Sequence, residues 1–132
     1  MLIQEDAIEI VGDYAREIEA QGVHLNMVIM YGSFAKGTQH EWSDIDVALV
    51  ADEFTGLPDD YDLFPYIGIK KPYIRIEAMT YPTDYFRESD PFIEEIKKEG
   101  IIIKQSVKAK NPASFIDISY SREEVPGTAR QR

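Results

Sequence analysis

The chain has 132 residues, of which 44% are hydrophobic, contains no cysteine and carries a net charge of −10. This length suits one compact soluble domain with a real core, and the lack of cysteine excludes disulfides, thiolate metal sites and cysteine nucleophiles. We expect no direct nucleic-acid binding, because an acidic protein is repelled by the phosphate backbone.

The first half of the chain predicts a helix and two strands. Apolar residues recur at three- and four-residue spacing over 4–21, which indicates a helix with one buried stripe. Residues 24–31 and 44–50 are short and rich in β-favouring residues, so both segments predict strands. The polar segment 32–43 between them predicts a turn whose middle holds a short helix.

The second half predicts a long connection, two strands and two helices. Residues 52–72 contain several glycines, prolines and aspartates, which indicates a connection with one helical turn. We expect the remaining elements to be a strand over 73–80 that is ended by Pro82, a helix over 83–88, a helix over 91–99 that is stopped by Gly100, and a strand over 101–103. This order predicts an α/β sandwich with one mixed sheet.

The pattern of apolar residues fades after residue 105. We therefore expect one domain over residues 1–105, and a tail over 106–132 that is loosely ordered or ordered by a partner. The net charge divides in the same way, with −12 on residues 1–105 and +2 on the rest. No signal-peptide pattern and no run of about 18 apolar residues is present, so we expect a cytoplasmic protein without membrane association.

Asp44 and Asp46 form the first candidate site. Side chains alternate along a strand, so both carboxylates point to one face, about 7 Å apart, while Ile45 and Val47 point to the other. Two such carboxylates repel each other unless a cation lies between them. Because Mg²⁺ is held by a few carboxylates and substrate phosphates, the pair predicts half of a metal–nucleotide site. Two solvated rim residues are the alternative.

Gly32 and Ser33 directly follow a predicted strand and form the second candidate site. Glycine lets the backbone approach a phosphate, whose oxygens can be held by exposed amides and by the Ser33 hydroxyl. A plain strand-ending turn is the alternative. Lys36 could contact the same phosphate or stay solvated, and Ser43 could cap a turn and orient the acid that follows it.

Glu77 is the candidate for a third carboxylate. It lies within a predicted strand between apolar residues, so its side chain must face either solvent or a site. A third acid could take part in metal binding or accept the proton of an acceptor hydroxyl. A surface ion pair with Arg75 or a lysine is an equally weighted alternative.

The pattern of Gly-Ser, ten further residues and then Asp-x-Asp resembles the signature of the DNA polymerase β-type nucleotidyltransferases. Within that group, the chain looks like a member of the minimal nucleotidyltransferase branch. The resemblance covers residues 4 to about 104. It implies a nucleotidyltransferase fold and Mg²⁺-dependent transfer of AMP from ATP to a hydroxyl. It also implies that Gly32 and Ser33 bind phosphate and that Asp44 and Asp46 are catalytic metal ligands. Glu77 stands where the family often has a third aspartate.

Small stand-alone members of this family resemble the antitoxin half of HEPN/MNT toxin–antitoxin pairs. That resemblance implies AMPylation of a tyrosine on a partner HEPN toxin, which is an RNase. The short chain leaves no room for the extra helical domain of antibiotic-modifying relatives. Two alternatives stay open: a catalytically weak module that neutralises a partner by forming a complex, and nucleotidylation of a small-molecule hydroxyl.

Several tyrosines lie in the middle of the chain. They fit packing at the core and its rim, or a surface patch that faces a partner. These residues are Tyr61, Tyr66, Tyr73, Tyr81 and Tyr85.

Overall fold

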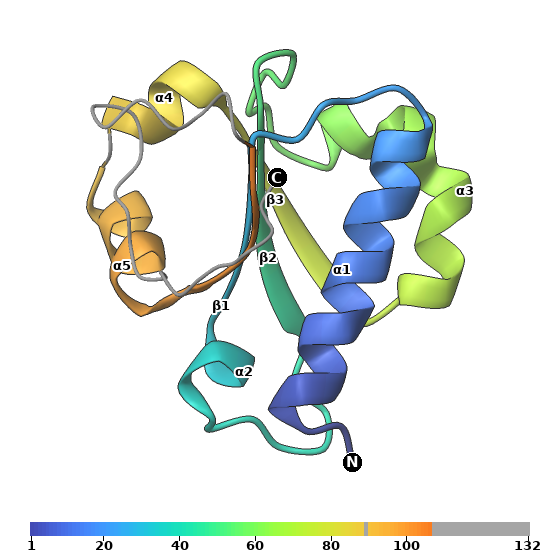
Figure 1. The fold of residues 1–132 in the computed structure, drawn as a ribbon, viewed down its shortest axis with the longest axis vertical. Helices are drawn as coiled ribbons and strands as arrows, with labels where there is room; N and C mark the ends of the chain where they lie inside the picture. Colours follow the sequence, from blue (N-terminus) through green and yellow to red (C-terminus); the bar gives the residue numbers. More distant parts are fainter. Residues whose placement is uncertain (89, 107–132) are drawn as a thin grey trace.

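A mixed sheet lies between two layers of helices in the computed structural model, which describes residues 1–88 and 90–106 (Figure 1). The strands are β1 (Met27–Tyr31), β2 (Ile45–Ala51), β3 (Ile76–Pro82) and β4 (Ile101–Gln105). Their order across the sheet is β3-β2-β1-β4. β2 and β3 pair in parallel, while β1 pairs antiparallel with both β2 and β4. This architecture confirms the expected α/β fold with one mixed sheet.

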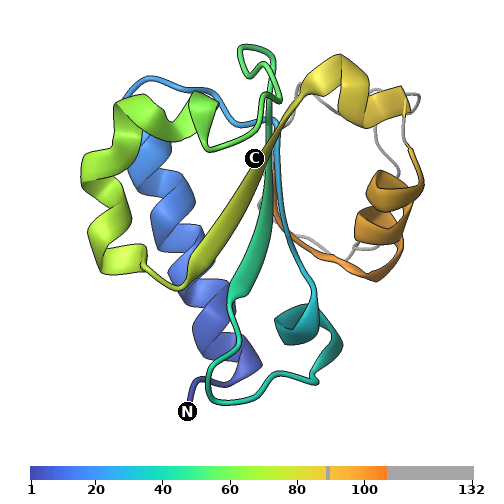
Figure 2. The same cartoon turned by 180° about the vertical axis from the view of Figure 1, so that it is seen from behind.

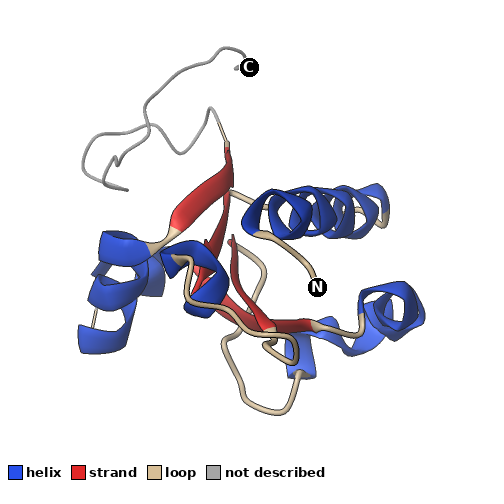
Figure 3. Cartoon of the chain, turned by 90° about the horizontal axis from the view of Figure 1, so that it is seen from below, coloured by secondary structure: helices blue, strands red, loops and turns tan. Residues whose placement is uncertain are grey.

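Helices cover both faces of the sheet. They are α1 (Gln4–Ala20), α2 (Ser33–Lys36), α3 (Ile67–Lys70), α4 (Thr83–Glu88) and α5 (Pro91–Glu99), with 3-10 helices η1 (Tyr61–Tyr66) and η2 (Lys71–Tyr73). The views from the front and from behind show α1 and α3 on one face and α4 and α5 on the other (Figures 1 and 2). The view from below shows the same separation, with the strands between the two layers (Figure 3).

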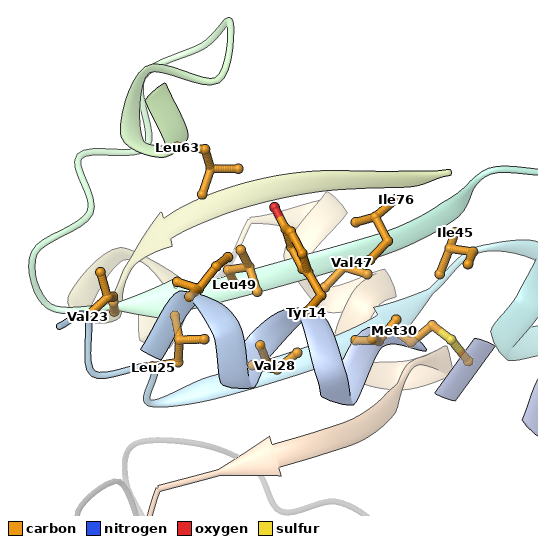
Figure 4. Packing of buried hydrophobic residues seen from close by; sticks show 14 of the residues in the cluster. Tyr14, Val23, Leu25, Val28, Met30, Ile45, Val47, Leu49, Leu63 and Ile76 are labelled. Carbon is orange, nitrogen blue, oxygen red and sulfur yellow. The ribbon is translucent and has the colours of Figure 1, made fainter. Parts of the chain in front are cut away.

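Alternation along β2 divides the core into two clusters. Ile45, Val47 and Leu49 pack in the cluster that also holds the apolar stripe of α1. Figure 4 shows Tyr14 of α1 pointing toward this side of β2. Ala48 and Val50 belong to the second cluster, on the face covered by α4 and α5. Asp46 lies in phase with these two residues and therefore shares their face of the sheet.

Most predicted elements are present, with shifted ends. β1 begins at Met27 rather than at residue 24, because Leu25 N donates to Glu19 Oε2 and Leu25 O accepts from Lys104 Nζ instead of joining a strand ladder. β3 begins later than residue 73, because η2 occupies residues 71–73. α2 starts directly after Gly32 and not in the middle of the loop.

The predicted connection over 52–72 contains more helix than the expected single turn. η1, α3 and η2 follow one another there, with Pro65 inside η1. Short 3-10 turns need few backbone hydrogen bonds, so they tolerate proline and glycine better than a long α-helix does. Tyr81 is buried, Tyr66 and Tyr73 are half-buried, and Tyr61 and Tyr85 are exposed, so the tyrosines do not form one patch.

The C-terminal end of the described chain is attached to the domain. Ser106, the first residue of the predicted tail, is buried, and its amide donates to Asn26 O at 2.8 Å. The rest of the predicted tail, 107–132, lies outside the described residues. None of the helices in the described part of the chain has the length and apolar character of a membrane span.

Candidate active site

Tyr31, Asp46 and Glu77 lie side by side on three neighbouring strands. Asp46 on β2 is the register partner of Tyr31 on β1 and of Glu77 on β3. Register partners place their side chains on the same face of a sheet, here the face covered by α4 and α5. The structure therefore brings together two of the predicted carboxylates, Asp46 and Glu77. Asp44 is exposed and precedes β2 by one residue.

Gly32 packs against the Asp46 carboxylate. A Cβ built on Gly32 would lie 2.2 Å from Asp46 Oδ2, and the backbone φ of Gly32 is +75°. A Cβ at this position would force the Asp46 carboxylate to move, and a positive φ is unfavourable for residues other than glycine. The predicted phosphate-binding turn and the predicted metal ligand are therefore in direct contact.

Burial and like charge act together on Asp46. Burial raises the pKa of Asp46 above its ordinary value, and the charges of Asp44 and Glu77 raise it further. Burial also raises the pKa of Tyr31, and the charge of Asp46 adds to that effect. Among the ion pairs of the described residues, none involves Asp44, Asp46 or Glu77. This arrangement destabilises the ionised carboxylate of Asp46 and favours binding of a cation.

The loop that carries Asp44 is held by Ser43 and Arg75. Ser43 is buried, and its Oγ accepts a hydrogen bond of 2.9 Å from His40 N. Nη2 of Arg75 donates to Ser43 O at 2.6 Å and to Glu41 O at 3.2 Å. Ser43 thus closes the turn that leads into Asp44, and Arg75 bonds to this loop rather than to Glu77.

Two long-range contacts fix helix α2. Nε2 of Gln4 donates to Phe34 O at 2.9 Å and to Ala35 O at 3.2 Å, which ties α2 to the start of α1. Nζ of Lys36 lies 3.2 Å from Oε1 of Glu99 at the end of α5. The structure therefore places Lys36, a predicted phosphate contact, in a partly exposed ion pair.

The carboxylates suit a hard divalent cation but are not already gathered into a metal cluster. Within the described residues, no group of three His, Cys, Asp or Glu side chains is arranged to hold a metal ion. Mg²⁺ nevertheless takes one or two carboxylates and completes its shell with water and substrate phosphate. The mutual repulsion that raises the pKa of Asp46 is relieved by such a cation. One or two of the carboxylates of Asp44, Asp46 and Glu77 therefore suit a site that substrate phosphates would complete.

The comparison with protein families agrees with this geometry. The family described as nucleotidyltransferase domain matches residues 14–118, which is most of the chain and includes every carboxylate of the site. The chain belongs to the nucleotidyltransferase domain family.

Some solved structures are similar to this chain. One is a toxin–antitoxin with AMP-PNP, 15% identical, with a TM-score of 0.53 over 78% of this chain and 80% of that chain. Another is a mutant of the toxin–antitoxin MntA-HpeT, 15% identical, with a TM-score of 0.45 over 86% of this chain and 82% of that chain. At such low identity the first similarity supports the fold alone. No curated protein sequence matches this nucleotidyltransferase.

Three residues in or beside the candidate site of this nucleotidyltransferase were not expected from the sequence. Tyr31 joins the carboxylates through strand register, Gln4 anchors α2, and Arg75 anchors the Asp44 loop. Tyr31 could have been proposed as a site residue from the sequence, because it directly precedes Gly32 at the end of a predicted strand. The partners of Gln4 and Arg75 are about 30 positions away along the chain, so no local pattern marks those contacts.

Proposed function

We propose that this nucleotidyltransferase transfers AMP from ATP to a tyrosine of a partner HEPN toxin and thereby acts as an antitoxin. The observation that carries the transfer chemistry is the contact between Gly32 and Asp46. It places the turn proposed to bind phosphate beside carboxylates that repel one another and suit a cation. This contact supports the proposal that the two segments form one metal–nucleotide site.

Each residue has a role in the proposed reaction. Gly32 and Ser33 bind phosphate oxygens through backbone amides and the Ser33 hydroxyl. Asp44 and Asp46, with Glu77 completing the set, would hold Mg²⁺, which when bound neutralises charge on the phosphates. Lys36 could leave its partly exposed ion pair with Glu99 to contact the triphosphate.

The proposed transfer is a single displacement at phosphorus. The acceptor hydroxyl oxygen bonds to the α-phosphorus while its proton passes to Glu77, which is exposed next to Asp46. The bond between the α-phosphorus and the oxygen that bridges to the β-phosphate breaks, and pyrophosphate leaves with that electron pair. Backbone amides that are already positioned lower the barrier, because they need no reorganisation.

Exposed apolar side chains near the carboxylates favour a protein acceptor. Trp42 is 80% exposed only two residues before Asp44. Phe92 is 48% exposed, and its ring packs edge-on against Tyr31 with the centroids 5.8 Å apart. Aromatic side chains such as these are enriched in protein–protein interfaces. The shared fold with a toxin–antitoxin crystallised with AMP-PNP supports the same choice.

The test is transfer of label from ATP to protein. The purified chain is incubated with Mg²⁺, α-labelled ATP and a purified HEPN toxin, and the toxin is then digested for mass spectrometry. We expect one nucleoside monophosphate on a toxin tyrosine. The Asp44→Ala variant should transfer no label although its melting temperature equals that of the wild type. An unlabelled toxin with every nucleoside triphosphate would refute the proposal, and label on a small molecule instead would identify a different acceptor class.

A binding module is the second candidate. It is favoured by the lack of a ready-made three-carboxylate metal cluster among the described residues. In that case complex formation alone would silence the toxin. Asp44→Ala distinguishes the two, because a binding module keeps full neutralising power without the carboxylate, whereas the transferase loses it.

A further inference from the structure

Leu57, Tyr61 and Phe64 form an exposed apolar surface on the connection between β2 and β3, named here the η1 patch. Their exposed fractions are 51%, 59% and 71%. Tyr61 and Phe64 are three residues apart in the 3-10 helix η1, in which side chains at this spacing lie above one another. Exposed apolar side chains that lie close together mark an interaction surface more often than single exposed residues do.

Asp62 fixes the shape of the η1 patch. Its Oδ1 accepts from Thr55 N at 2.9 Å and from Thr55 Oγ1 at 3.0 Å, and its Oδ2 accepts from Gly56 N at 2.9 Å. Oδ2 also accepts a bond of 2.7 Å from Thr80 Oγ1 on β3. One carboxylate thus holds the residues before Leu57 against η1 and holds η1 against the sheet. A surface that is ordered before binding loses less entropy when a partner docks.

The backbone between Leu57 and Tyr61 is strained. Asp59 and Asp60 have φ values of +62° and +58°, in the left-handed region that costs a non-glycine residue roughly 1 kcal/mol or more. Two consecutive residues in this conformation turn the chain sharply between Leu57 and Tyr61. Backbone strain of this kind clusters at functional sites.

Exposed acidic residues lie close to the η1 patch along the chain. Asp52, Glu53, Asp59 and Asp60 are exposed, and none of them forms an ion pair with a side chain that the structure describes. This charge disfavours a second copy of the chain, a nucleic acid and an anionic membrane as occupants, since each would bring like charge to the surface. A protein with lysine or arginine around an apolar groove has the complementary charge.

The η1 patch lies at the other end of the sheet from the carboxylates. β2 starts at Ile45, next to Asp44, and ends at Ala51, next to the loop that leads to the patch. Its seven residues span roughly 20 Å at the usual rise of a strand. Figure 1 shows this loop at the upper end of β2 and α2 at the lower end of the molecule. A partner held at the patch therefore leaves the carboxylates open.

We propose that the η1 patch docks a protein partner through an apolar groove rimmed by lysine or arginine, separately from the catalytic residues. The partner's identity as the HEPN toxin rests on the proposed function, whereas the surface and its chemistry do not. Docking at a remote surface raises the local concentration of an acceptor hydroxyl near Asp46 without occupying the site.

The first test measures binding of purified HEPN toxin by calorimetry without nucleotide. The patch variant carries Leu57→Ser and Phe64→Ser, and the control is Ile3→Ser, because Ile3 is 52% exposed and Leu57 is 51% exposed. We expect the patch variant to bind about 100-fold more weakly and the control to bind as the wild type does. Equal affinity of the patch variant and the wild type would overturn the proposal.

The two proposals fail in distinguishable ways. If toxin binding depends on the η1 patch but no label is transferred to the toxin, the docking surface is supported and the proposed transferase activity is refuted. If the patch variant transfers label to the toxin as fast as the wild type does, the docking surface is refuted and the proposed transferase activity is not. Asp46→Asn should bind the toxin normally in either case, since its carboxylate is remote from the patch.

The second test does not assume which protein docks. A photo-crosslinking amino acid replaces Tyr61 in one protein and Ile3 in another, and adducts formed in cells are identified by mass spectrometry. We expect a protein adduct at position 61 alone, and its purified partner should bind the wild type but not the patch variant. Adducts at position 61 with a second copy, with residues 107–132 or with RNA, or no adduct at all, would overturn the proposal.

Discussion

Gly32 and Asp46 are in such close contact that a Cβ on Gly32 would lie 2.2 Å from Asp46 Oδ2. The two residues come from different strand ends, and the contact forms because β1 and β2 pair with Tyr31 opposite Asp46. Strand pairing therefore determines the distance between the turn proposed to bind phosphate and the carboxylate proposed to bind metal. A change at either residue should disturb both functions.

Gly32→Ala should abolish nucleotide binding, and Gly37→Ala is its matched control. Both glycines have a positive φ, +75° and +76°, but a Cβ on Gly37 would meet nothing within 4 Å. Both variants should lose about 1 kcal/mol of stability from backbone strain, and Gly32→Ala should lose more because its Cβ meets Asp46 Oδ2. Only Gly32→Ala should lose affinity for ATP in calorimetry. Equal affinities of the two variants would show that the contact with Asp46 has no role in binding.

Asp46→Asn should raise the melting temperature at neutral pH while removing activity. Burial and the charges of Asp44 and Glu77 disfavour the ionised carboxylate, and the amide removes this penalty. The gain should be at most about 1 kcal/mol, because Asp46 is partly exposed to solvent. Adding Mg²⁺ with ATP should stabilise the wild type and not the variant in a thermal-shift assay. A large fall in the variant's melting temperature would indicate a structural role instead.

Asp62→Asn should destabilise the domain in a pH-dependent way. Burial raises the pKa of Asp62, but hydrogen bonds from Thr55, Thr80 and Gly56 outweigh this effect and leave the pKa below its ordinary value. A lowered pKa in the folded state contributes stability above the unfolded pKa, and this stability is lost as the pH falls through the folded pKa. The variant should be about 1–2 kcal/mol less stable at neutral pH, with a smaller difference below about pH 4. The free energies of unfolding of the variant and the wild type, measured with denaturant at neutral pH and below about pH 4, check this prediction. A difference between them that grows as the pH falls would contradict it.

Lys36→Ala and Glu99→Ala together decide whether Lys36 binds phosphate. The ion pair between them is partly exposed, so its loss should cost less than about 1 kcal/mol in either variant. If Lys36 contacts the triphosphate, Lys36→Ala raises the KM for ATP about 10-fold while Glu99→Ala leaves it unchanged or lower. Equal kinetics of the two variants would assign Lys36 a structural role only.

Local patterns predicted the parts of the fold that depend on neighbours in the chain. The stripe of α1 and the alternation along β2 are visible in the sequence, and alternation correctly put Asp46 on the face opposite Ile45 and Val47. The helix that starts at Pro91 was also predictable, because Asp90 before it is a typical capping residue. In the structure, Asp90 Oδ1 accepts a hydrogen bond from Ile93 N.

Contacts between distant segments were not predictable from local patterns. The late start of β1 depends on Glu19 and Lys104, which take up the backbone groups of Leu25. The bond from Arg75 to the Asp44 loop and the placing of Tyr31 beside Asp46 depend on which strands pair, and in which register. Register is set by the packing of whole faces, so a single sequence leaves it open.

Transfer from ATP labelled on either the α- or the γ-phosphate tests the central claim most directly. The wild type and Asp46→Asn are each incubated with Mg²⁺, the toxin and one of the two labelled nucleotides. We predict that the α-label becomes attached to the toxin, that the γ-label leaves as pyrophosphate, and that Asp46→Asn transfers neither label. Attachment of the γ-label, or equal transfer by the wild type and the variant, would contradict a nucleotidyltransferase site at Gly32 and Asp46.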